Sequence, residues 1–192
     1  MNKQADSLSM SAQKCMERRK KEYPPFVIDL RSADEYRAGH IAGSRLIPAE
    51  KLESRLDQLP PNTAVIVYDQ EGGESSQKAA QALKDFGVRK AFFIEGGYES
   101  FSAAVDASDD KIEKFPVDQW VTEIEKLFEG TLKPMLQEHG GGITVKSAAP
   151  GDLKLQYMGS CATCEDSING TLKLIHAQLQ GYFNHEFKIS LV

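Results

Sequence analysis

The sequence predicts an α/β domain with a doubly wound, mainly parallel sheet, followed by a small α+β domain with the element order α-β-β-α-β. Short β-branched or aromatic runs alternate with helical stretches from Phe26 to Val105, and repeated βα units form parallel sheets. Beyond a polar, acidic segment the pattern changes to a helix, two strands, a helix and a last strand. The expected bounds are 8–105 for the first domain, 106–116 for a linker and 117–192 for the second domain.

The first domain should open with an edge strand at Leu8 and Ser9 and a helix that Ser11 caps and that runs through Lys20. The further strands are expected at Phe26–Arg31, Arg45–Pro48, Ala64–Asp69 and Lys90–Glu95. The helices between them are expected at Asp34–Ala38, Lys51–Leu59, Ser75–Phe86 and Tyr98–Val105. Ligand sites of such sheets lie where the strands end, so the carboxyl end of the strand at 64–69 is the expected site.

The second domain follows the linker, which has no apolar period and precedes Pro116. Its first helix carries apolar residues at helical spacing from Trp120 to Leu136, with Pro134 expected to bend it and three glycines from Gly140 to end it. Two strands, Ile143–Ser147 and Leu153–Met158, flank the turn Pro150-Gly151-Asp152. A second helix has its apolar stripe at Ile168, Leu172, Ile175 and Leu179, and Phe187–Leu191 is the last strand.

Composition excludes several classes of protein. The chain has 192 residues, 41% of them hydrophobic and 27% charged, which is ordinary for a globular protein. No run approaches the roughly 20 apolar residues of a membrane helix, and residues 1–22 lack the apolar core of a secretory signal, so we expect a cytoplasmic protein without membrane contact. The net charge of −5 argues against nucleic acid, and the basic run Arg18–Lys21 is interpreted as a solvated helix end. Three cysteines, two of them in CxxC spacing, indicate a reducing compartment with metal or redox chemistry.

The strongest chemical signal is Cys161-Ala162-Thr163-Cys164, between a strand-like run and a helix-like run from Glu165. A helix start favours thiolates. The pair could be a thioredoxin-like dithiol, half of a metal site or inert. Only 28 residues follow Cys164 and none is proline, which argues against thioredoxin, and no second CxxC or paired histidines complete a zinc site, since His139, His176 and His185 stand alone. Two copies of the chain would supply four thiolates, which suits a shared [4Fe–4S] cluster or, less well, zinc; an empty site also stays open.

These residues also resemble a known family. The run Gly159–Ser167, followed by Thr171-Leu172-Lys173, resembles the C-x-x-C-x-x-S…T-L-K signature of the NifU C-terminal (Nfu) domain, and Leu132–Leu136 with Gly140-Gly141 is similar to that family's first helix and its glycine stop. The resemblance implies an iron–sulfur cluster scaffold or carrier. It further implies that Cys161 and Cys164 of each subunit in a homodimer hold one [4Fe–4S] cluster, which passes to apo iron–sulfur proteins.

Three hydroxyl residues near the pair, Ser160, Thr163 and Ser167, could either donate hydrogen bonds toward sulfur or cap the helix. His139 stands where the family often has an acidic residue. We expect that departure to affect a turn and not the ligands.

A second resemblance covers about Leu8 to Val105. The segments that resemble a rhodanese domain are Ile28–Arg31, Glu35-Tyr36, Gly39–Ser44, Ile47-Pro48 and Gly96-Gly97-Tyr98 with Phe101. In that family the loop after the strand at 65–68 carries the catalytic cysteine of a sulfurtransferase, and here Asp69 stands at the matching position. A carboxylate cannot accept sulfane sulfur as a persulfide, and the arginine usual near the end of the loop is missing too. The resemblance therefore implies a domain without rhodanese activity.

Three expectations follow for the first domain. We expect Asp69 to fill the ring of backbone N–H groups itself, leaving the loop as a rigid docking surface. Cys15 should be a buried apolar residue and a poor substitute nucleophile. Asp29, Arg31 and His40 should make structural hydrogen bonds.

The sequence leaves three functions open. The first is a non-enzymatic cluster scaffold or carrier, with the first domain recruiting targets. The second is an enzyme in which Cys161 or Cys164 transfers sulfur or shuttles electrons as a dithiol. The third is an interaction protein in which both sites are inactive.

Overall fold

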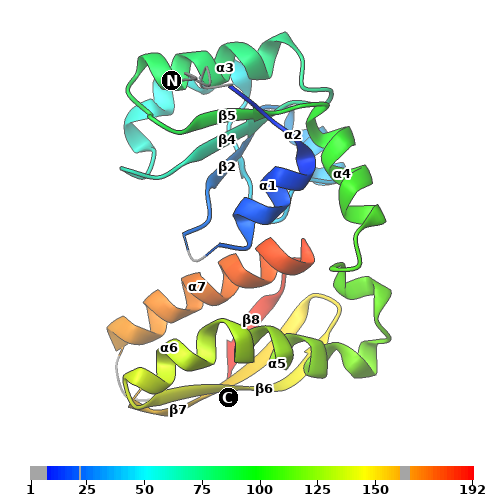
Figure 1. Ribbon diagram of the computed structural model, residues 1–192, viewed down its shortest axis with the longest axis vertical. Helices are drawn as coiled ribbons and strands as arrows, with labels where there is room; N and C mark the ends of the chain where they lie inside the picture. The colour runs from blue at the N-terminus through cyan, green and yellow to red at the C-terminus, as the bar shows by residue number, and fades with distance from the viewer. Residues whose placement is uncertain (1–7, 22, 161–164) are drawn as a thin grey trace, which may run out of the picture. The chain divides into compact units, whose positions relative to one another are not determined.

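A computed structural model describes residues 8–21, 23–160 and 165–192 (Figure 1). The chain divides into two units, Met1–Ser108 and Asp109–Val192, and each is described here by itself. Within the described residues, no helix is both long and apolar enough to cross a membrane.

The first unit is built on a parallel five-stranded sheet in the order β1-β5-β4-β2-β3. Its strands are β1 (Ser9–Met10), β2 (Phe26–Asp29), β3 (Arg45–Leu46), β4 (Val65–Tyr68) and β5 (Ala91–Ile94). Its helices are α1 (Ala12–Arg19), α2 (Ala33–Ala38), α3 (Glu74–Asp85) and α4 (Gly97–Ala107). The predicted alternation of strands and helices in a parallel sheet is confirmed.

Both faces of this sheet are covered. Alternate residues of a strand point to opposite faces, and in β4 Val65 and Val67 pack with Leu83 of α3. Ile66 of the same strand packs instead with Phe101 of α4, in the cluster that also includes residues of α1. An apolar run buried on both faces is typical of a doubly wound sheet, so the predicted class holds.

One predicted helix of the first unit is wrong. Residues 51–59 do not form an α-helix; the chain makes two 3₁₀ segments, η1 (Ala49–Lys51) and η2 (Glu53–Gln58). Pro48 precedes the first segment and Pro60 follows the second closely, so the stretch between them is short. Two leucines, Leu52 and Leu56, are buried against the sheet. A stretch this short gains little from α-helical cooperativity, and the tighter i→i+3 turns suffice.

The second unit has the predicted order with one helix divided. Its elements are η3 (Ile112–Lys114), η4 (Val117–Gln119), α5 (Trp120–Gly130), α6 (Leu132–Glu138), β6 (Gly141–Ala149), β7 (Asp152–Gly159), α7 (Glu165–Phe183) and β8 (Lys188–Leu191). The sheet order is β6-β7-β8, with β6 antiparallel and β8 parallel to β7. The three α-helices lie on one side of this sheet (Figure 1).

The helix break does not lie at Pro134. The chain leaves helical geometry at Thr131, with φ −128° and ψ −65°. Pro134 is the third residue of α6, where a backbone N–H would have no partner within the helix, so proline is tolerated. Across the break, Lys133 of α6 pairs with Glu125 of α5, with 2.5 Å between Nζ and Oε2.

Part of the segment expected as a linker belongs to the second unit. Ile112 is fully buried and packs with Trp120, Ile124 and Phe128 in the core of that unit. Phe115 packs against the same core. The single apolar side chains in this segment carry no period, which is why the sequence pattern indicated a linker.

Candidate functional site

The loop after β4 lies at the carboxyl end of the first unit's sheet and begins with Asp69. Oδ1 of Asp69 accepts hydrogen bonds from the backbone N–H groups of Gly72 at 2.6 Å and Gly73 at 3.2 Å. Oδ2 accepts one from the N–H of Ser76, in the first turn of α3, at 3.1 Å. Three donors thus converge on one carboxylate. The expectation that Asp69 fills its own ring of N–H groups is confirmed.

The loop is held in shape by the start of α4. Tyr98 N–H donates to the carbonyl oxygen of Asp69 at 2.9 Å, and Glu99 N–H donates to that of Gln70 at 3.1 Å. Gly97 adopts φ +55°, and a Cβ atom there would lie 2.5 Å from both the oxygen of Asp69 and the nitrogen of Gly72. Only glycine permits this approach. Two segments far apart in the sequence therefore fix the cradle, which consists of Asp69 and the N–H groups of Gly72, Gly73 and Ser76.

The rim of the cradle is negatively charged. Glu71 and Glu74 are exposed on the same loop and helix start. A hydrogen bond from Lys78, together with its charge, holds the pKa of Glu74 below its usual range. These carboxylates and that of Asp69 repel an incoming anion such as thiosulfate.

A buried polar network connects the loop to the core of the first unit. Asp29 is fully buried, and its Oδ2 accepts from Arg31 Nη2 at 2.7 Å and from the hydroxyl of Tyr68 at 2.6 Å. Burial, and then the charge of Asp29, raise the pKa of Tyr68. Arg31 reaches the loop by donating to Oε1 of Gln70 at 2.9 Å, and its guanidinium lies 4.1 Å from the ring centroid of Tyr98.

His40 contacts Tyr36 of α2. Its Nδ1 is 3.0 Å from the carbonyl oxygen of Tyr36, and the two rings stack with centroids 3.8 Å apart. The structural roles expected for Asp29, Arg31 and His40 are thus what the contacts show.

Cys15 lies in α1 with no exposed surface. Burial raises the pKa of its thiol to about 11, against the opposing charges of Arg19 and Arg18. A thiol that is inaccessible and protonated is not a nucleophile, as expected.

Cys161 and Cys164 lie outside the described residues, as does Thr163. The chain on either side is described: β7 ends at Gly159 and α7 begins at Glu165. Gly159 adopts φ +62°, and a Cβ atom there would lie 2.2 Å from the oxygen of Gly140. The backbones at Gly159 and Gly140 thus approach closely, which fixes the chain before the cysteine pair.

Ser160 makes two further hydrogen bonds at the same corner of the chain, where Gly159 meets Gly140. Its N–H donates to the oxygen of Gly140 at 3.1 Å and its hydroxyl donates to that of His139 at 2.6 Å. The hydroxyl is therefore held by the turn after α6. His139 itself is exposed and is the residue directly after α6, at the turn where we expected its effect.

The other two histidines of the second unit have different surroundings. His185 Nδ1 lies 2.6 Å from Oε1 of Glu113, and its ring contacts those of Trp120 and Phe187. His176 is half-buried in α7, and burial lowers its pKa, against the opposing charge of Glu186. Across the described ranges, no three His, Cys, Asp or Glu side chains gather so as to hold a metal ion.

Sequence reasoning missed two parts of the first site. It did not find Tyr68 and Gln70 as the residues that connect Asp29 and Arg31 to the loop. A tyrosine at the end of a buried strand was the available signal, because a buried hydroxyl needs a partner.

Comparison with known proteins identifies both units. The family model of the rhodanese-like domain matches residues 11–104, and that of the NifU-like domain matches residues 124–189. Thiosulfate sulfurtransferase GlpE of Pseudomonas putida is 33% identical over 97 residues, which cover 50% of this chain and 84% of that protein. The uncharacterized protein YqhL of Bacillus subtilis is 31% identical over 81 residues, 42% of this chain and 64% of that protein.

A further relative matches a stretch longer than the second unit. The mitochondrial NFU1 iron-sulfur cluster scaffold homolog of Drosophila erecta is 30% identical over 118 residues, which cover 62% of this chain and 40% of that protein. The chain therefore spans less than two thirds of the length of YqhL and of this homolog. Among solved structures, a rhodanese-related protein of Thermoplasma volcanium shares 27% identity, with a TM-score of 0.45, over 50% of this chain and 91% of that one. The chain belongs to the rhodanese-like family, as a fusion of a rhodanese-like domain that lacks the loop cysteine with a NifU-like domain.

Proposed function

We propose that this protein is an iron–sulfur cluster scaffold or carrier. Cys161 and Cys164 of each of two subunits hold one [4Fe–4S] cluster as cargo, which then passes to apo iron–sulfur proteins. The observation that carries the proposal is the CxxC motif between β7 and α7 of a NifU-like domain. A relative of this region is named an iron-sulfur cluster scaffold.

Half of a site per chain suits a carrier. Four thiolates are the usual ligand set of a [4Fe–4S] cluster, and two chains related by a two-fold axis supply them. Opening one interface then releases the cluster, whereas a four-cysteine site in one chain must unfold locally to do so. The CxxC also precedes a helix, where the dipole favours thiolates.

The exposed surface at the end of β7, the strand that precedes the cysteine motif in the chain, favours a protein contact there. Met158 lies on the outward face of β7, the same face as Gln156 two residues earlier, and is 48% exposed. It lies over Gly142 of β6, where an added Cβ would meet its methyl carbon at 3.3 Å. An exposed methionine is a common element of protein contact surfaces. We propose that the partner subunit covers it when the cluster is bound.

We propose residues 8–105 as an inactive rhodanese-like docking module and residues 117–192 as the carrier. Sulfur transfer requires a thiolate in the loop after β4, and the Asp69 carboxylate occupies the donors that would bind the anionic substrate. The reducing compartment that these thiols need is, we propose, the cytoplasm.

Reconstitution under anaerobic conditions tests the carrier. With iron, sulfide and dithiothreitol the protein should gain the broad brown absorbance of one [4Fe–4S] cluster per dimer. Cys161→Ser and Cys164→Ser should abolish it, while Cys15→Ala should keep it, because Cys15 is buried in the first unit. A colourless monomer with a titratable disulfide would instead support a thiol enzyme that uses the same pair.

A sulfurtransferase assay tests the docking module separately. With thiosulfate and cyanide we expect no turnover by the wild-type protein. Turnover that is lost in Asp69→Ala would contradict an inactive loop. Turnover lost in Cys161→Ser but kept in Asp69→Ala would assign sulfur transfer to the cysteine pair.

A further inference from the structure

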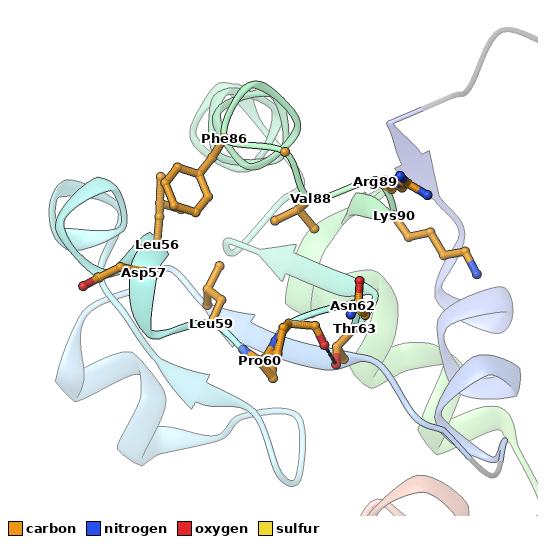
Figure 2. Close-up of a pocket in the computed structure, with 12 residues that line it drawn as sticks. Leu56, Asp57, Leu59, Pro60, Asn62, Thr63, Phe86, Val88, Arg89 and Lys90 are labelled. Atoms are coloured by element: carbon orange, nitrogen blue, oxygen red, sulfur yellow. Dashed lines mark hydrogen bonds between the residues drawn. The ribbon is translucent and has the colours of Figure 1, made fainter.

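A groove lies at the amino ends of β4 and β5, the end of the sheet opposite the Asp69 loop. It has a volume of about 740 Å³, within the range of binding clefts. Three segments form it: the end of η2, the turn before β4 and the connection from α3 to β5 (Figure 2). The Asp69 loop does not contribute to it.

The centre of the groove is apolar. Leu59 and Val88 are half-buried and point toward one another across it, with Leu56 beside them (Figure 2). Phe86, on the rim, is 55% exposed. Among the described residues of the first unit, the large apolar side chains that are exposed are Phe86 and Tyr23. An exposed aromatic ring beside half-buried leucine and valine side chains offers an apolar contact to one side chain of a ligand.

One wall of the groove is positively charged. Arg89 and Lys90 are exposed, and neither side chain makes an ion pair or hydrogen bond with a described residue. Asp57 also lines the groove, at the opposite end from Arg89 and Lys90; its carboxylate, like the ammonium group of Lys90, points away from the Leu59–Val88 centre (Figure 2). The chain as a whole carries a net charge of −5, so this pair of cations stands out against it. The apolar centre of the groove and the cations Arg89 and Lys90 together fit an anionic, amphipathic ligand.

An extended segment of protein matches this layout better than an enclosed small molecule. Most of the lining residues are exposed or half-buried, so the groove is open along its length. An extended peptide presents alternate side chains to one surface, which lets an apolar side chain enter between Leu59 and Val88 while a neighbouring carboxylate meets Arg89 or Lys90.

We propose that this groove binds an extended, acidic segment of a partner protein through one apolar or aromatic side chain flanked by carboxylates. The apolar side chain occupies the space between Leu59, Val88 and Phe86. The carboxylates pair with Arg89 and Lys90. This binding requires neither the cluster nor the cysteine pair, so it stands apart from the proposed carrier role.

Selection from a displayed library of random peptides tests the proposal. The full-length wild-type protein is the bait, with counter-selection on the double variant Arg89→Glu, Lys90→Glu. We expect enriched peptides to carry Asp or Glu next to Phe, Leu, Ile or Trp. An enriched peptide, labelled with fluorescein, should bind the double variant about tenfold more weakly and with a steep salt dependence. Phe86→Ala should weaken it several-fold.

The matched control is the double variant Lys14→Glu, Arg45→Glu, which makes the same charge change at two exposed cations outside the groove. It should bind as the wild type does. Equal weakening in both double variants would mean attraction to overall charge and would overturn the proposal. Failure to enrich any acidic peptide would overturn it as well. So would wild-type self-association that Arg89→Glu abolishes, which would make a second copy the occupant. Unchanged circular dichroism and melting temperatures show that each variant folds.

Discussion

Oδ1 of Asp69 accepts a hydrogen bond from the backbone N–H of Gly72 at 2.6 Å. A second donor on the same oxygen and a third on Oδ2 complete the arrangement. The Asp69 carboxylate therefore supplies an internal anion for the three donors. The loop is a self-contained structural element.

The first prediction concerns the stability of this loop. Asp69→Ala leaves three part-buried N–H groups without their acceptor, so the free energy of unfolding should fall by about 1 to 3 kcal/mol. Glu71→Gln is the control, since it removes one negative charge from the same loop at an exposed position. Urea unfolding measures both. A fall of equal size in Glu71→Gln would mean that the loop's charge matters and the hydrogen bonds do not.

The second prediction concerns thiol reactivity. Cys15 is buried and its pKa is raised to about 11, so iodoacetamide at about pH 8 should not modify it in the native protein. After unfolding in urea it should react fully. Mass spectrometry of the native protein without cluster, before any unfolding, should show alkylation at Cys161 and Cys164 alone. Rapid native labelling of Cys15 would contradict its place in the core.

The third prediction concerns the corner before the cysteine pair. Gly159→Ala adds a methyl group that would meet the oxygen of Gly140 at 2.2 Å, in addition to the strain of φ +62°. Gly151→Ala is matched, because Gly151 has φ +77° but nothing within 4 Å of the added atom. The free energy of unfolding should fall by about 1 kcal/mol in the control and by about 2 kcal/mol more in Gly159→Ala.

The same pair of variants separates strain from cluster binding. Gly159→Ala should also release a reconstituted cluster faster, because it displaces the strand that leads to Cys161. The absorbance decay after a chelator is added measures this rate. Equal rates in the Gly159→Ala and Gly151→Ala variants would mean that the corner does not position the ligands.

The fourth prediction concerns pH. Burial lowers the pKa of His176 below its ordinary 6.5, so the unfolded chain takes up a proton at a higher pH than the folded one does. The contribution of His176 should therefore lower the free energy of unfolding as the pH falls through 6.5 toward the pKa that His176 has in the folded protein. Between about pH 7.5 and 5.5, His176→Gln should lose less stability than the wild type. His139→Gln, at an exposed histidine, is the control, and an identical loss in both variants would contradict the effect of burial.

The elements with strong local patterns could be predicted from the sequence. The short β-branched and aromatic run Val65–Tyr68 indicates a buried strand, and the helical spacing of the stripe through Ile175 and Leu179 indicates a helix. The cradle could be predicted too, because a carboxylate followed by glycines at a strand end has local donors within reach. The misplaced features are those in which a distant contact decides the outcome, as at Ile112, whose burial depends on the second unit's core.

The groove could not be predicted for the same reason. Leu59, Val88 and Arg89 come from separate connections, and only the parallel sheet brings the starts of β4 and β5 together. The break at Thr131 is similar: the sequence offered Pro134 as the obvious interruption, while an ion pair between Glu125 and Lys133 spans the actual one.

The shared cluster site is tested most directly by native mass spectrometry of the anaerobically reconstituted protein. The account predicts a dimer whose added mass is that of one [4Fe–4S] cluster, and a monomer without iron after Cys161→Ser or Cys164→Ser. The Cys15→Ala protein should give the same loaded dimer as the wild type. A monomer that retains iron and sulfide, or a loaded dimer that persists without Cys161 and Cys164, would contradict the claim that these cysteines form half of a shared site.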